Sequence, residues 1–166
     1  MSKNPLSEET SLAPKLNIVI IYETIDFATK ASAMLQKAWR GLEETIRWSF
    51  QPWRVDILEL PSAADEALAE ARGAHMILFA MRQVLSLPQW LFHWLERWAT
   101  GRSVPDAALA IWDASNTAPG PARASSELIA FANRHGLSLI LDDIAPSAGR
   151  SLGRASHHHS HWGINE

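Results

Sequence analysis

The chain contains no cysteine, which excludes disulfides, cysteine-ligated zinc or iron–sulfur centres, and thiol catalysis. It also lacks an excess of positive charge: 15 Lys and Arg against 18 Asp and Glu give a net charge of -3, so no basic field would attract nucleic acid or anionic membranes. No apolar run approaches the ~18 residues of a membrane span, and the first residues carry no hydrophobic signal segment. We therefore expect a cytoplasmic protein that binds neither nucleic acid nor membranes.

Tyrosine is scarce and tryptophan abundant, with one Tyr and five Phe against eight Trp. Tryptophan combines a large apolar body with a single N–H donor, so it favours half-buried positions such as interfaces and pocket walls. This bias is the first indication that the protein works through contacts.

The length of 166 residues and a hydrophobic content of 47% fit one compact domain, because roughly 70% of the unfolded surface of such a chain can be buried. Polar, proline-containing residues precede the first apolar run, and Gly, Ser, Arg and His dominate after the last one. We predict an N-terminal arm at residues 1–15, an α/β domain at 16–144 and a His-containing tail at 145–166.

Apolar runs and amphipathic segments alternate along the chain. They predict strands at residues 16–22, 53–60, 75–81, 107–112 and 137–141, and helices at 25–48, 62–73, 89–100 and 126–135. The first and third strands are almost continuously apolar, which is typical of central strands, whereas the second alternates like an edge strand. The sequence therefore predicts a three-layer α/β fold with a five-stranded parallel sheet in the order 2-1-3-4-5, the flavodoxin-like arrangement.

The final helix of such folds is missing from the predicted pattern. The last strand runs into Ala145-Pro146-Ser147-Ala148-Gly149, which does not favour a helix. One half of a sheet face would then expose several hundred Å² of apolar surface, more than a monomer usually tolerates. The arm, the tail or a second copy of the chain must cover it, and we expect a homodimer.

Ligands of open parallel sheets bind at the carboxyl ends of the strands, near the point where the strand order reverses. The sequence places several polar residues at those ends, and the candidates for ligand binding are Glu23, Arg82, Asp113, Ser115 and Asp142.

The element order over residues 16–144 resembles, weakly, the receiver domain of bacterial response regulators, and Ala74-His75-Met76-Ile77-Leu78-Phe79-Ala80 looks like the third strand of that family. Active receivers present an acidic pair after strand one, a phosphorylatable Asp after strand three, Ser or Thr after strand four and Lys after strand five. Glu23 matches one acid and Ser115 lies near the hydroxyl position, but Met81 or Arg82 occupies the phosphoacceptor position and strand five ends in acids. An arginine cannot accept a phosphoryl group as a carboxylate does. The resemblance implies a degenerate, non-catalytic receiver-like module for protein interaction or signalling.

An enzyme is the alternative. Glu23, Asp113, Asp142 and Asp143 would converge on one rim, where their oxygens suit Mg²⁺ or Mn²⁺, although loop acids are commonly just solvated. A flavin is not expected, because residues 23–29 contain no glycine for a phosphate loop and carry two carboxylates. No other cofactor is indicated.

Four histidines cluster in the predicted tail, at His157, His158, His159 and His161. Clustered imidazoles can bind Zn²⁺, Ni²⁺ or Cu²⁺, but such a tract is often merely solvated. Trp162 and Ile164 follow it and resemble the apolar anchors of a docking peptide.

Three tryptophans, Trp90, Trp94 and Trp98, recur every four residues in the helix predicted at 89–100. Helical spacing puts them on one flank of the helix, beside His93 and Arg97. Tryptophan next to arginine is typical of interaction hot spots. We predict an interface that includes these three tryptophans and Trp39, with burial of all three in the core as the alternative.

Overall fold

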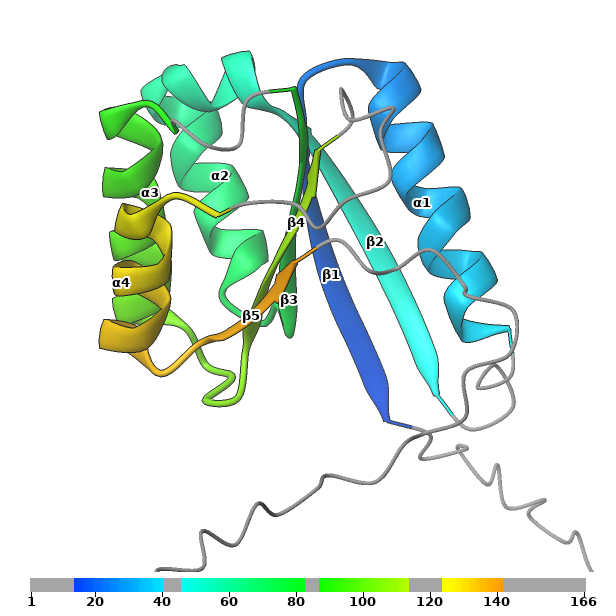
Figure 1. The fold of residues 1–166 in the computed structure, drawn as a ribbon. Coiled ribbons are helices and arrows are strands. Elements are labelled where there is room, and N and C mark those ends of the chain that lie inside the picture. Colours follow the sequence, from blue (N-terminus) through cyan, green and yellow to red (C-terminus); the bar gives the residue numbers. More distant parts are fainter. Residues whose placement is uncertain (1–13, 41–45, 83–86, 114–123, 142–166) are drawn as a thin grey trace, which may run out of the picture.

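The structure, a computed structural model, describes residues 14–40, 46–82, 87–113 and 124–141 (Figure 1). Its elements follow in the order β1 (Lys15–Tyr22), α1 (Ile25–Trp39), β2 (Arg47–Arg54), the 3₁₀ helix η1 (Val55–Glu59), α2 (Pro61–Ala71), β3 (Met76–Met81), α3 (Gln89–Gly101), β4 (Ala108–Asp113), α4 (Ser126–His135) and β5 (Ser138–Leu141).

The five strands form one parallel sheet in the order β2-β1-β3-β4-β5, which confirms the predicted flavodoxin-like topology. Helix α1 covers one face, and α2, α3 and α4 cover the other, so the molecule has three layers (Figure 1). None of the helices in the described ranges has the length and apolar character needed to cross a membrane.

The central strands explain why the order was predictable. All six residues of β3 are buried, and Ile18 to Ile21 of β1 have no exposed surface. Successive side chains of a strand point to opposite faces, so Ile77 and Phe79 pack toward α2, α3 and α4, while Met76 and Leu78 pack toward α1. A strand covered on both faces must be apolar throughout.

Helix α1 is shorter than predicted. The sequence predicts a helix at 25–48, but α1 ends at Trp39, with Arg40 as its C-cap. Trp48 and Phe50 belong to β2 and pack on the same core as α1, because alternate residues of a strand share one face of the sheet. The rings of Trp39 and Trp48 contact each other at a tilt of 45°, with centroids 4.8 Å apart, which joins the end of α1 to β2.

The predicted second strand at 53–60 is also wrong, because β2 lies earlier in the chain and contains Pro52. The Arg47 amide donates a hydrogen bond to the Pro14 carbonyl, so the alternate amides of β2, at Ser49, Gln51 and Trp53, face β1. Pro52 then points its nitrogen away from the sheet, where the missing N–H removes no ladder hydrogen bond. Its placement confirms that the second strand is an edge strand.

The residues after β2 form a 3₁₀ helix rather than the end of a strand. Val55 and Leu58, three positions apart, both pack on the core beside α2, as the 3₁₀ repeat requires. The alternation of Val55 and Ile57 mimics a strand, but the burial of Leu58, 2% exposed, shows which period governs the segment.

The tryptophans of α3 divide into core and surface. Trp94 and Trp98 are 3% and 0% exposed, and their indole N–H groups donate to the Ala64 and Ala71 carbonyls of α2, at 3.0 and 2.8 Å. Both donors are satisfied inside the protein, which corrects the prediction of an exposed flank at these two positions. Trp90, one turn from Trp94, is half-buried at the start of the helix.

Beyond β5 the described part of the chain shows no further element, and residues 142–166 lie outside it. β1 begins at Lys15, which the prediction assigned to the arm. On the face of α1, the residues of β4 and β5 include Ala108, Trp112 and Ile140, all of them half-buried.

Candidate functional site

The carboxyl ends of β1 and β3 are neighbours at the point where the strand order reverses. Glu23 follows β1, and its amide donates to the Ala80 carbonyl at 3.2 Å. The Arg82 amide donates in turn to Oε2 of Glu23 at 3.0 Å. The carboxylate of Glu23 therefore holds the backbone that leaves β3, and the structure brings Glu23 and Arg82 together as the sequence predicts.

Phe27 positions the Arg82 side chain. Thr24 caps α1, and its hydroxyl accepts the Phe27 amide at 3.4 Å. The Arg82 guanidinium lies 5.6 Å from the centre of the Phe27 ring, within the range of a cation–π contact. The same ring meets Trp112 of β4 edge-on, with centroids 6.3 Å apart. At the carboxyl ends of β1 and β3, Glu23 and Arg82 are therefore already engaged by contacts within the chain.

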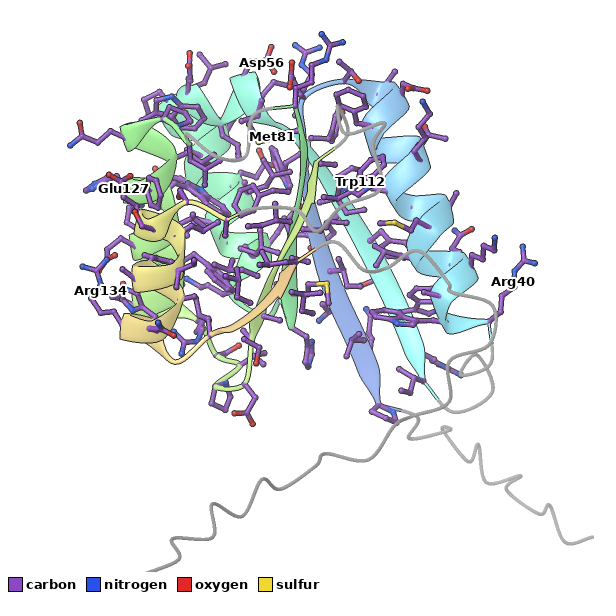
Figure 2. The ribbon with its side chains drawn as sticks, in the orientation of Figure 1. Arg40, Asp56, Met81, Trp112, Glu127 and Arg134 are labelled. Carbon is purple, nitrogen blue, oxygen red and sulfur yellow. The ribbon has the colours of Figure 1, made fainter. Side chains whose placement is uncertain are left out.

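A cavity of about 530 Å³ opens at this edge of the sheet, between the strand ends, η1 and the start of α3. Figure 2 shows Asp56 and Met81, two of its lining residues, at the same end of the molecule. A second cavity of about 330 Å³ continues between η1, α2 and α3 and shares Glu59 and Trp90 with the first. We call the two together the Trp90 groove. Its lining comprises Glu23, Val55, Asp56, Leu58, Glu59, Ala64, Met81, Arg82, Pro88, Trp90, His93, Trp94 and Arg97.

Acidic side chains dominate the end of the Trp90 groove near the sheet. Asp56 accepts a hydrogen bond from Nε of Arg54 at 2.6 Å, and this bond holds the pKa of the Asp56 carboxyl below its usual value. Asp56 is therefore a carboxylate at neutral pH. Glu59 is exposed and makes no ion pair within the described residues.

Trp90 lines both cavities. The indole N–H groups of Trp53, Trp94 and Trp98 all donate hydrogen bonds, to Glu70, Ala64 and Ala71. Among the same described residues, the indole N–H of Trp90 has no acceptor. A half-buried aromatic ring with an open donor is suited to contact a bound group.

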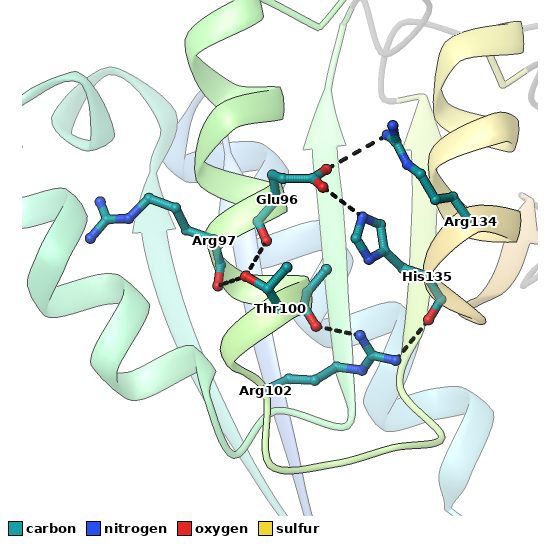
Figure 3. A network of polar contacts seen from close by, with 7 residues as sticks. Glu96, Arg97, Thr100, Arg102, Arg134 and His135 are labelled. Carbon is teal, nitrogen blue, oxygen red and sulfur yellow. Dashed lines mark hydrogen bonds and ion pairs between the residues drawn. The ribbon is translucent and has the colours of Figure 1, made fainter.

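A third cavity, of about 640 Å³, lies between α3 and α4 and is lined by Leu87, Gln89, Phe92, Glu127, Ala130, Phe131 and Arg134. Four residues after Phe92 in α3, Glu96 contacts both Arg134, at 3.6 Å, and His135, at 3.0 Å (Figure 3). Arg102 donates to the carbonyls of Ala99 and His135. These contacts fasten α4 to the end of α3.

The remaining predicted site residues are placed only in part. Asp113 ends β4 at the same sheet edge as Glu23 and Arg82. Ser115, Asp142 and the histidines at 157, 158, 159 and 161 lie outside the described residues. Within the described ranges, no group of three or more His, Asp or Glu side chains could hold a metal ion.

The sequence analysis missed the contribution of η1. It placed Asp56 and Glu59 in a strand, where residues three positions apart point to opposite faces of the sheet. The 3₁₀ turn instead brings both to the wall of the Trp90 groove. Leu58, whose apolar side chain is three residues after that of Val55, was the available signal for this turn.

Comparison with known proteins gives no relative for this chain, since no protein-family model, curated sequence or solved structure matches it.

Proposed function

We propose that the protein is a non-catalytic, receiver-like module that acts by binding other protein surfaces, in signalling or assembly, and is not phosphorylated on aspartate. The contact between Glu23 and Arg82 carries this proposal. Active receivers present an acidic pair after the first strand and a phosphorylatable aspartate after the third. Here Glu23 accepts a backbone N–H, and the resemblance puts Met81 or Arg82 where that aspartate is expected.

Phosphoryl transfer needs a nucleophilic oxygen in line with the donor and a cation to neutralise the developing charge. The Met81 thioether and the Arg82 guanidinium offer no such oxygen. One carboxylate oxygen of Glu23 already accepts the Arg82 amide, which fixes the backbone after β3. This geometry suits a rigid binding surface better than a reaction centre.

We expect incubation with a small acyl phosphate and Mg²⁺ to leave the mass of the protein unchanged, because no carboxylate occupies the acceptor position after β3. Intact-mass spectrometry measures the outcome, with a thermal-shift titration of Mg²⁺ and Mn²⁺ alongside. A phosphorylated product would contradict the proposal. So would a specific metal-dependent rise in melting temperature that Asp113→Ala abolishes, and that result would favour the metal-dependent enzyme.

We further propose that the module is a homodimer and that a second copy packs on the sheet face beside α1. An α-helix is about 10 Å wide, whereas five strands span roughly 19 Å, four spacings of 4.8 Å. In the described residues α1 is the one helix on this face, and it lies over β1, β2 and β3. Ala108, Trp112 and Ile140 extend the apolar surface beyond it and remain half-buried.

The same apolar strip on a second copy is its natural complement, because a two-fold axis brings identical patches together. The strip includes Ile140 of β5, a four-residue edge strand with Ser138 exposed. A short edge does not favour pairing of strands between copies, so we expect the faces rather than the edges to meet.

We expect Ile140→Glu to weaken the dimer at least tenfold, because it would place an unpaired carboxylate in an apolar contact. Sedimentation velocity across micromolar concentrations measures the association. Ile129→Glu is the matched control, since Ile129 is 41% exposed on α4, which covers the opposite face. A compact wild-type monomer, or equal effects of the two variants when circular dichroism shows both folded, would contradict the dimer.

A further inference from the structure

We propose that the Trp90 groove binds a basic segment of this same chain, residues 150–161 of the C-terminal region. The groove presents acidic and aromatic side chains at the carboxyl ends of the strands. The chain leaves β5 at this same end of the sheet and continues into the C-terminal region. This inference does not depend on the homodimer, which concerns the sheet face beside α1.

The groove offers the contacts that an arginine side chain requires. Trp90 presents a half-buried ring, and the guanidinium of an incoming arginine can stack on it. Glu59 lies beside Trp90 in both cavities and has no ion-pair partner in the described ranges, so its carboxylate is available to the same guanidinium. The open indole N–H of Trp90 can donate to a backbone carbonyl of the bound segment.

The charge of the groove selects a cation. Glu23, Asp56 and Glu59 line the cavity near the sheet, with Arg82 as the opposing charge. Arg82 contacts the Phe27 ring, Asp56 pairs with Arg54 at 2.6 Å, and Arg97 of the second cavity pairs with Asp65. The carboxylate of Glu59, which has no ion pair among the described residues, is therefore the one that offers an incoming guanidinium a complementary charge.

Residues 150–161 of this chain have the matching composition. They contain Arg150, Arg154 and four histidines and no acidic residue, although the whole chain has a net charge of -3.

The topology makes the contact reachable. All strands of a parallel sheet end at one edge, so Leu141 at the end of β5 lies at the edge that carries Glu23 and Arg82. Arg150 follows Leu141 by nine positions, a reach of about 30 Å for an extended chain. Three strand spacings, roughly 14 Å, separate β5 from β1. Tethering at this range corresponds to an effective concentration in the millimolar range, so even a weak contact would be occupied.

Trypsin cleavage after Arg150 and Arg154 in the full-length chain tests the proposal, because a bound backbone does not fit the active site of a protease. We expect Glu59→Lys to accelerate both cleavages about five- to tenfold and Glu59→Gln to do so less. Glu66→Lys is the matched control: Glu66 is exposed on α2 and lines neither cavity, yet the charge change is identical. In wild-type protein, 0.5 M salt should reproduce much of the Glu59→Lys effect because it screens exposed charges.

Equal cleavage rates in wild type and Glu59→Lys, with both proteins folded by near-ultraviolet circular dichroism, would overturn the proposal. The same acceleration in Glu66→Lys would also overturn it, because the effect would then reflect overall charge. Protection that increases with protein concentration would show that the tail of a second copy occupies the groove instead. The first two outcomes leave the sedimentation test of the homodimer unaffected, and in the third the association would persist in Ile140→Glu.

Discussion

Trp98→Ala is expected to lower the free energy of unfolding by about 4 kcal/mol, the largest effect of any single substitution considered. Trp98 is the largest fully buried side chain in the described part of the protein. Its removal leaves a cavity between α3, α2 and the sheet, and it strips the Ala71 carbonyl of the indole donor at 2.8 Å. Both losses act in the same direction.

Urea denaturation followed by circular dichroism measures this change, with Trp98→Phe as the comparison. Phenylalanine keeps most of the apolar volume but has no N–H, so we expect it to cost about 2 kcal/mol. Trp39→Ala should cost less than Trp98→Ala, since Trp39 is only half-buried. A loss of less than 1 kcal/mol for Trp98→Ala would show that the helix does not pack as described.

Arg102→Ala is expected to cost about 2–3 kcal/mol, from several charge-assisted hydrogen bonds lost together. Arg102 follows α3 and donates to the carbonyls of Ala99, Val104 and His135. These groups belong to the end of α3, the following loop and the end of α4. One side chain therefore holds three segments together, as Figure 3 shows for its contacts with α3 and α4.

The control for Arg102 lies five residues earlier. Arg97 pairs with Asp65 at 2.8 Å, but both side chains are largely exposed, at 46% and 63%. Exposed ion pairs contribute little, so Arg97→Ala should change the free energy of unfolding by no more than about 0.5 kcal/mol. Equal losses in the two variants, measured by the same urea titration, would contradict the role assigned to Arg102.

The strand order was predictable because burial on both faces leaves a mark on the sequence. Residues 18–21 and 76–81 had to be apolar at every position, and apolar runs of this length are typical of strands buried on both faces. The end of α4 was predictable for a different reason: Gly136 adopts a positive φ of 63°, a conformation that a side chain would strain and that glycine commonly provides at helix ends.

The position of β2 could not be predicted from the local pattern. An edge strand is half-exposed, and its periodicity is correspondingly weak: the four successive residues 48–51 are all half-buried, so no alternation marks the strand. Pro52 argues against a strand until the direction of its nitrogen is known, and that direction depends on the register with β1. The register is set by both strands together, so the sequence of one strand alone does not reveal it.

The candidate site was half predictable. Glu23 and Arg82 follow central strands, and the topology rule alone brings them together. Asp56 and Glu59 line the Trp90 groove only because residues 55–59 form a 3₁₀ helix. Whether a tryptophan of α3 is buried depends on a hydrogen-bond acceptor in another element. Trp94 and Trp98 donate to carbonyls of α2, whereas Trp90 has no such acceptor among the described residues. The helical spacing of the three tryptophans does not predict this difference.

The outward nitrogen of Pro52 has a consequence for how these molecules behave at high concentration. A foreign strand aligned with the free margin of β2 would find one hydrogen-bond donor absent near its middle, with Arg47 and Arg54 adding positive charge at both ends. Fibril growth proceeds by adding strand upon strand through an unbroken ladder of amides. β2 is the longer of the two edge strands, and the missing donor at Pro52 makes it a poor template for aggregation.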